Sequence, residues 1–202
     1  MRFPWTLRPS RSFACAGMVF AAAIPIGDEV REEPSIDRAR STVTIRVSKA
    51  GALSGLAHEH IVSAPIASAR LQQGPSPEVE VVFETRSLEV LDPGLSASDR
   101  ARVREVMEGA QVLDATRYPQ IVFHATDVRR QEDGRYTLTG TLSLHGRDRP
   151  LRLDVALHEG RWHGSAILIQ SDFGIEPIRF AGGLVRVGDA VEVEVNVALE
   201  GS

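Results

Sequence analysis

The alternation of apolar and polar residues in the C-terminal half of the chain constrains the fold more than any other feature. Between Tyr136 and His145 one set of alternate positions is mostly apolar, and the other set carries threonine, serine and histidine. The pattern returns over residues 151–158 and 191–199. Because a period of two is typical of strands with one buried face, we predict an all-β fold that closes as a barrel or sandwich. Small-molecule function in such folds usually lies in the interior or at its mouth.

Glycine and proline residues divide the chain into a series of short strands. We expect strands over residues 43–47, 60–71, 79–85, 120–130, 135–145, 151–158, 161–170 and 190–199. Most of their connections are short, which favours antiparallel neighbours, because a parallel pair needs a crossover of a dozen or more residues. Pro65 favours an edge position or a bulge in the second of them. One amphipathic helix is predicted between a cap at Ser96 or Ser98 and a stop at Gly109, across an end or rim of the barrel.

Charge and motifs exclude several classes of function. The formal net charge of −4 comes from interspersed acidic and basic residues, and no basic block is present that could neutralise a run of phosphates. We therefore expect no nucleic-acid partner. The chain has no nucleophile elbow, phosphate loop or dinucleotide fingerprint, and its histidines lack a nucleophile or orienting carboxylate at a useful spacing. We expect a protein that is not an enzyme and has no cofactor.

The N-terminal residues have the pattern of a secretory signal. Arg2, Arg8 and Arg11 precede an apolar stretch over residues 13–26, in which Ala21–Ala23 offers small residues to a signal peptidase. An uncleaved anchor is the alternative, but about 14 apolar residues fall short of the roughly 20 needed to span a bilayer. We predict a periplasmic or secreted protein without stable membrane insertion after cleavage.

The predicted signal sets the domain boundaries. We assign residues 1–26 to the signal peptide, 27–40 to a charged leader and 41–202 to the β-barrel domain. Cys15 is the single cysteine and lies within the signal, so the mature protein would contain no thiol. Lipidation of Cys15 is an alternative, although Ser12 stands where a lipoprotein signal normally has a leucine-like residue.

Three ordered segments of the chain carry a family resemblance. They are RYPQIVFHAT at 117–126, LTGTLSLHGRDRPLRLDV at 138–155 and SDFGI at 171–175, followed by a VGD turn at 187–189 before the last strand. With them the chain resembles the YceI-like family of polyisoprenoid-binding proteins. The resemblance implies a lipocalin-like antiparallel β-barrel of about eight strands, usually periplasmic, with a long apolar cavity. The chain departs from the family around the helix and at GLAHEHIV over 55–62, both near the expected cavity entrance.

An apolar lipid, such as a polyisoprenoid or a fatty-acyl chain, is the ligand that this resemblance implies. We expect the protein to sequester or transport it, and the oligomeric state stays open, a homodimer included. Small residues at Gly140, Gly164 and Ala166 favour space inside the barrel. A filled interior and a structural, partner-binding role is the alternative. The candidate lining residues are Val81, Phe83, Leu142, Leu144, Val155 and Phe173.

His58 and His60 suggest a second class of function. On an extended segment residues two apart face the same side, so both imidazoles could approach one metal ion, with His124, His145 or an acidic residue completing its ligands. The HEH sequence lacks the helical spacing of a zinc protease motif. A metal-binding protein or metal-dependent enzyme centred on His58 and His60 is therefore the alternative function. Otherwise we expect these histidines to form a polar cavity mouth or to be hydrogen-bonded loop histidines.

Overall fold

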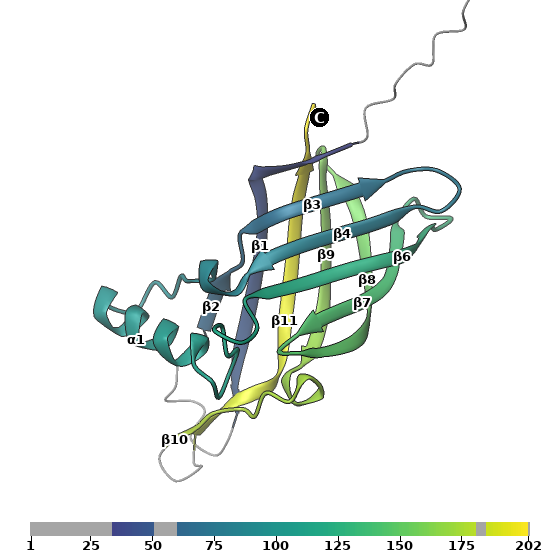
Figure 1. The fold of residues 1–202 in the computed structure, drawn as a ribbon. Coiled ribbons are helices and arrows are strands. Elements are labelled where there is room, and N and C mark those ends of the chain that lie inside the picture. The colour runs from purple at the N-terminus through teal and green to yellow at the C-terminus, as the bar shows by residue number, and fades with distance from the viewer. Residues whose placement is uncertain (1–33, 51–59, 181–184, 202) are drawn as a thin grey trace, which may run out of the picture. The chain divides into compact units, whose positions relative to one another are not determined.

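A computed structural model of the protein describes residues 34–50, 60–180 and 185–201 (Figure 1). The chain divides into two units, Met1–Arg31 and Glu32–Ser202, and every described residue belongs to the second. The predicted signal peptide, Cys15 and His58 lie outside the described residues. Within the described residues, no helix has the length and apolar character needed to cross a membrane.

The alternating segments form strands, which confirms the predicted all-β fold. The strands are β1 (Ile36–Ala50), β2 (His60–Ser63), β3 (Ile66–Gln72), β4 (Glu78–Glu84), β5 (Glu89–Val90), β6 (Gln120–Arg130), β7 (Tyr136–Leu144), β8 (Arg147–His158), β9 (Arg161–Ile169), β10 (Arg179–Phe180) and β11 (Val185–Leu199). Eight of these described strands have seven residues or more, the number that the family resemblance implies. The other three are short pieces of the same sheet.

Several strand boundaries differ from the prediction. Pro65 lies between β2 and β3 and divides the strand expected over 60–71, because proline cannot donate to a strand ladder. Strand β1 begins at Ile36, inside the segment 27–40 predicted as a leader, and Ile36 pairs with Leu199 at the end of β11. The segment 187–189, expected as a turn, is part of β11, where the pairing with β1 changes register.

The sheet is antiparallel and curls on itself. Its strands follow the order β3-β4-β6-β7-β8-β9-β11-β1-β2-β5, and β10 pairs with β11. The curl brings β1 close to β3, near the other end of the strand order. Ala64 N donates to Val43 O at 2.8 Å, and Arg38 Nη1 donates to Ala67 O at 2.5 Å. In Figure 1, β3, β4 and β6 cross in front of β1, β11 and β9. The curled sheet is a lipocalin-like barrel whose inner face carries the apolar residues.

Tight turns connect the strands of the second half. β7 and β8 are joined at His145 and Gly146, with φ of 50° and 71°, and β8 and β9 at Glu159 and Gly160, with φ of 50° and 75°. Positive φ at both central residues is the geometry of a type I′ turn, whose twist matches that of the strands. A Cβ at Gly146 would also lie 2.4 Å from Tyr118 Cε1. Gly146 and Gly160 are thus found in the turns that they were predicted to mark, whereas Gly188 lies within β11.

Gly140 allows a bend between β6 and β7. The pairing of the two strands changes register between Ala125 and Asp127, and Ala125 lies opposite Gly140. A Cβ at Gly140 would lie 2.1 Å from His124 O and 2.5 Å from Ala125 Cα. Because both neighbours are backbone atoms, no side-chain rotation can make room. The glycine therefore permits the close strand approach that accompanies the bulge.

The helix α1 (Ala97–Glu108) lies between β5 and β6, as predicted. Ser96 is its cap: Asp99 N donates to Ser96 Oγ at 3.1 Å, and Ser96 Oγ donates to Asp99 Oδ2 at 2.7 Å. Arg100 Nη1 donates to Leu95 O at 2.7 Å and to Asp92 O at 3.3 Å, which ties the first turn to the preceding loop. None of the helix residues is buried.

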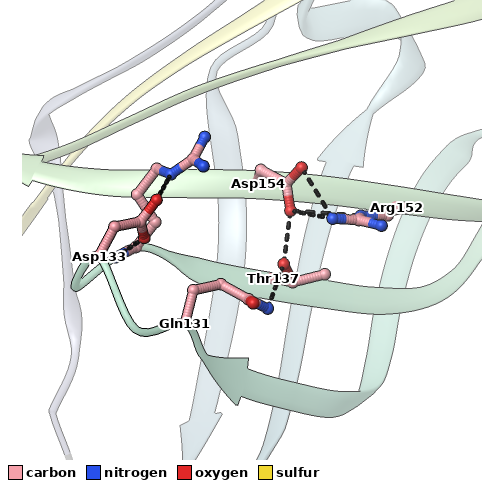
Figure 2. Close-up of polar contacts among 6 residues, drawn as sticks. Gln131, Asp133, Thr137, Arg152 and Asp154 are labelled. Carbon is pink, nitrogen blue, oxygen red and sulfur yellow. Dashed lines mark hydrogen bonds and ion pairs between the residues drawn. The ribbon is translucent and has the colours of Figure 1, made fainter.

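A polar cluster on the outer face joins the β6–β7 hairpin to β8 (Figure 2). Thr137 is only 7% exposed; its Oγ1 accepts from Gln131 Nε2 at 2.9 Å and donates to Asp154 Oδ1 at 2.5 Å. Arg152 Nη2 donates to the two carboxylate oxygens of Asp154 at 3.1 and 3.2 Å. The hydrogen bond from Thr137, and then the bond and charge of Arg152, lower the pKa of Asp154.

Gly140→Ala should destabilise the protein by about 1–3 kcal/mol, because the backbone of β6 must move away from the new Cβ. The urea unfolding midpoint measures this loss. Gly94→Ala is the control, since a Cβ at Gly94 meets no atom within 4 Å, and its effect should stay within about 0.5 kcal/mol. Equal midpoints for the two variants would contradict the close approach at Gly140.

Asp154→Asn should lower stability at pH 7 and have a smaller effect in acid. The folded-state pKa of Asp154 is lowered, so its carboxylate stabilises the fold above its unfolded pKa, and this stabilisation is lost as the pH falls through the folded value. The difference between wild type and variant should therefore narrow below about pH 4. Urea unfolding from pH 7 to pH 2 measures it. A stability difference that stays constant over this range would contradict the stabilising role of the Asp154 carboxylate. Thr137→Val removes the hydrogen bond to Asp154 and should reproduce most of the loss of stability at pH 7.

Candidate binding cavity

A cavity of about 930 Å³ lies inside the barrel. This volume is at the upper end of the range of about 300–1,000 Å³ typical of small-molecule sites. All eight long strands contribute to its wall, which is mostly aliphatic. Representative wall residues are Ile45, Leu71, Val81, Phe123, Leu142, Leu153, Leu168 and Val193. The cavity extends from the β3–β4 hairpin at one end to α1 at the other. Its shape and chemistry suit an extended hydrocarbon chain.

The antiparallel register selects which residues form the wall. Val81 of β4 pairs with Phe123 of β6, and both line the cavity. The next pair along, Glu80 and His124, belongs to the opposite face of the same two strands. Apolar and polar residues are thus separated pair by pair, and the wall follows from the alternation in the sequence.

Five of the six residues predicted to contact the ligand lie on the cavity wall. They are Val81, Phe83, Leu142, Leu144 and Val155. Phe173 is the exception: it is 3% exposed in the hydrophobic core and is not a wall residue. It ends the short helix η3 (Gln170–Phe173), so the alternation of the strands does not place it, and His145 Nδ1 lies 3.1 Å from its carbonyl oxygen. Contact between the five wall residues and a ligand stays a prediction.

The small residues predicted to leave space have different roles. Ala166 of β9 lines the cavity. Gly140 and Gly164 do not line it; a Cβ at Gly164 would lie 2.6 Å from Asp154 O and 2.8 Å from Val155 Cγ1. These two glycines therefore permit close strand packing, and only Ala166 leaves room for a ligand.

Sequence reasoning missed other parts of the wall. The apolar residues of β1 and β11 alternate as wall residues do, but they were not among the predicted lining residues. Nothing in the sequence showed that the rings of Tyr136 and Trp162 pack edge to face, with their centroids 5.3 Å apart. The helix contributes further residues that only its position reveals. The added wall residues include Val43, Val191, Val195, Val197, Tyr136, Trp162, Val103, Val106 and Met107.

A histidine interrupts the apolar wall near α1. His60 of β2 lines the cavity, and its Nδ1 lies 2.5 Å from Asp92 Oδ2. Asp92 is 3% exposed, and its Oδ1 accepts from Ile61 N at 2.5 Å. The loop after β5 thus holds a buried carboxylate against the imidazole.

The described residues contain no group of three histidine, cysteine or acidic side chains that could hold a metal ion. His124, one of the proposed partners, pairs with Glu78 at 3.7 Å, and His145 lies in the β7–β8 turn against Tyr118. Neither contacts His60 in the structure. His58 and Glu59 lie outside the described residues, so the complete HEH hypothesis stays a prediction.

The whole described sheet corresponds to one known domain. A model of the YceI-like domain matches residues 35–199. This chain belongs to the YceI-like family. No curated protein matches it in sequence.

Two solved structures share the fold at low sequence identity. Burkholderia cenocepacia BcnA superimposes with a TM-score of 0.62 at 17% identity, over 81% of this chain and 98% of BcnA. A polyisoprenoid binding domain from Saccharophagus degradans, implicated in plant cell wall breakdown, superimposes with a TM-score of 0.53 at 15% identity, over 83% of this chain and 98% of that one. The likeness confirms the fold of the YceI-like barrel.

Replacing either of two inward-facing alanines by phenylalanine should show which of them borders the cavity and which lies in the packed core of this YceI-like protein. Ala166→Phe places its ring in the cavity and should stay within about 1 kcal/mol of wild type, or be more stable, because it buries apolar surface. Ala125 is fully buried beside Gly140, so Ala125→Phe should cost about 1–3 kcal/mol through overpacking. Urea unfolding measures both. Equal destabilisation would show that the interior at Ala166 is filled.

Proposed function

We propose that this YceI-like protein binds an apolar chain, a polyisoprenoid or fatty-acyl lipid, inside its barrel and sequesters or transports it without catalysis. The observation that carries the proposal is the cavity of about 930 Å³ with its aliphatic wall. The Saccharophagus degradans neighbour, a polyisoprenoid binding domain, supports a ligand of this class. Export to the periplasm or the cell exterior, predicted from residues 1–26, belongs to the same proposal.

Burial of hydrocarbon supplies enough free energy for such a complex. An extended lipid that loses about 400 Å² of apolar surface gains about 10 kcal/mol, at roughly 25 cal/mol per Å². Loss of translational freedom and ordering of the chain offset part of this gain. With an association cost of about 4 kcal/mol, about −6 kcal/mol remains, which corresponds to a dissociation constant of roughly 10–100 μM without any charged anchor.

The distribution of polar groups supports binding rather than catalysis. The polar wall residues come from the β3–β4 hairpin, α1, β2 and the segment around η3: Gln72, Gln73, Glu78, Asp99, Arg102, His60, Gln170 and Glu176. The middle of the described wall carries hydrocarbon side chains, such as Val81 and Leu153. A lipid chain lying there contacts aliphatic side chains, and the His60–Asp92 pair stands at the α1 end of the cavity with no nucleophile beside it among the described residues.

Phe83→Asp should weaken binding of the apolar fluorophore diphenylhexatriene by more than about tenfold. The variant puts a carboxylate on the aliphatic wall, where desolvation costs several kcal/mol unless the group is protonated or hydrated. Fluorescence titration measures the dissociation constant, and circular dichroism checks the fold.

Two control variants accompany this test. Phe83→Leu keeps the wall apolar and should retain binding within a few-fold, and Glu80→Ala changes the opposite face of the same strand and should leave both affinity and stability nearly unaltered. If Glu80→Ala lost as much affinity as Phe83→Asp, or if wild type did not bind the fluorophore, the proposed function would be wrong.

A further inference from the structure

His60 is a polar residue on an apolar wall. It shares the inward face of β2 with Val62, which is 4% exposed, and it pairs with Val47 of β1, another wall residue. The His60 side chain is 30% exposed, so its place among valines removes part of its hydration, and this is unfavourable without a compensating interaction. Asp92 provides one such interaction.

Asp92 holds the imidazole at Nδ1 and so selects the Nδ1–H tautomer of the neutral ring. Its carboxylate accepts from Ile61 N through Oδ1 and faces His60 Nδ1 through Oδ2, each at 2.5 Å. A carboxylate accepts hydrogen bonds, so the hydrogen-bond pattern assigns a proton to Nδ1 and leaves Nε2 of a neutral ring as an acceptor. Among the described residues, Nε2 has no hydrogen-bond partner. The pair therefore presents an unused acceptor at the α1 end of the cavity.

The surrounding residues hold this arrangement in place. Leu91 N donates to Ile61 O at 2.8 Å, and Arg100 Nη1 donates to Asp92 O at 3.3 Å, so the loop that carries Asp92 is bound to both β2 and α1. The polar residues at the other end of the cavity differ from His60 and Asp92 in their exposure to solvent. Gln72 and Gln73 are exposed at the β3–β4 hairpin, where water satisfies them.

We propose that His60 anchors the polar end of the ligand by accepting a hydrogen bond from a terminal hydroxyl group at Nε2, and that Asp92 is the positioning residue. The inference rests on the proposed function and narrows its ligand to an alcohol with a long apolar chain. The hydroxyl end lies beside α1, and the chain extends along the barrel toward Tyr136 and Trp162. A ligand without an O–H group covers Nε2 without giving it a hydrogen-bond donor.

Three probes of equal chain length test the anchor: 1-dodecanol, dodecyl methyl ether and dodecane, each competing with diphenylhexatriene. The test variant combines His60→Leu with Asp92→Asn, so that no buried carboxylate is left without its partner, and the new side-chain amide oxygen can still accept from Ile61 N. The variant should weaken dodecanol binding about three- to tenfold, the effect of one neutral hydrogen bond. The ether and the hydrocarbon should change less than twofold.

His124→Gln is the matched control, because it alters a histidine that is no part of the cavity wall, and it should change none of the three affinities. The anchor is wrong if the double variant weakens all three probes equally or none of them, or if the ether loses as much as the alcohol. Diphenylhexatriene binding distinguishes failure of the two proposals. If the wild type does not bind diphenylhexatriene, the proposed lipid-binding function is wrong. If the wild type binds it but the double variant shows no selective loss of dodecanol affinity, only the anchor is wrong.

Discussion

The cavity depends on strand register more than on any single contact. In an antiparallel sheet a slip of one residue would move Val81 and Phe123 to the outside and bring Glu80 and His124 into the interior. The wall is therefore maintained by whatever fixes the pairing. Two-residue turns fix it between β7, β8 and β9, and the bulge at Gly140 fixes it between β6 and β7.

Much of the fold could be predicted from local pattern. The alternation over 136–145 and 191–199 identified strands and their buried faces, and the turn glycines marked the hairpins, because both signals are contained in a few adjacent residues. Five of the predicted ligand-contacting residues lie on the cavity wall for the same reason. The beginning of β1 at Ile36 was missed, since its pairing with Leu199 joins opposite ends of the described chain.

The remaining features depend on distant contacts. Phe173 has an apolar side chain in a family motif, but its position in η3 directs it into the core and away from the cavity. Gly140 and Gly164 suggested empty space, whereas they accommodate backbone and side-chain atoms of neighbouring strands. Asp92 gave no signal at all, because a sequence of aspartate, proline and glycine is typical of a turn. Its role follows only from the approach of His60.

The pairing of β1 with both β2 and β11 has a consequence for how the barrel forms. Hairpins such as β7–β8 need only neighbouring residues, but the ladder from Ile36 to Leu199 joins residues at the two ends of the described sheet. Contacts of such long sequence separation are slow to form, because the loop-closure entropy is lost before the contact stabilises the chain. Until β11 is available to β1, the apolar inner face has no closed wall. Closure of the interior therefore requires β11, and a chain that lacks β11 exposes its aliphatic face to water.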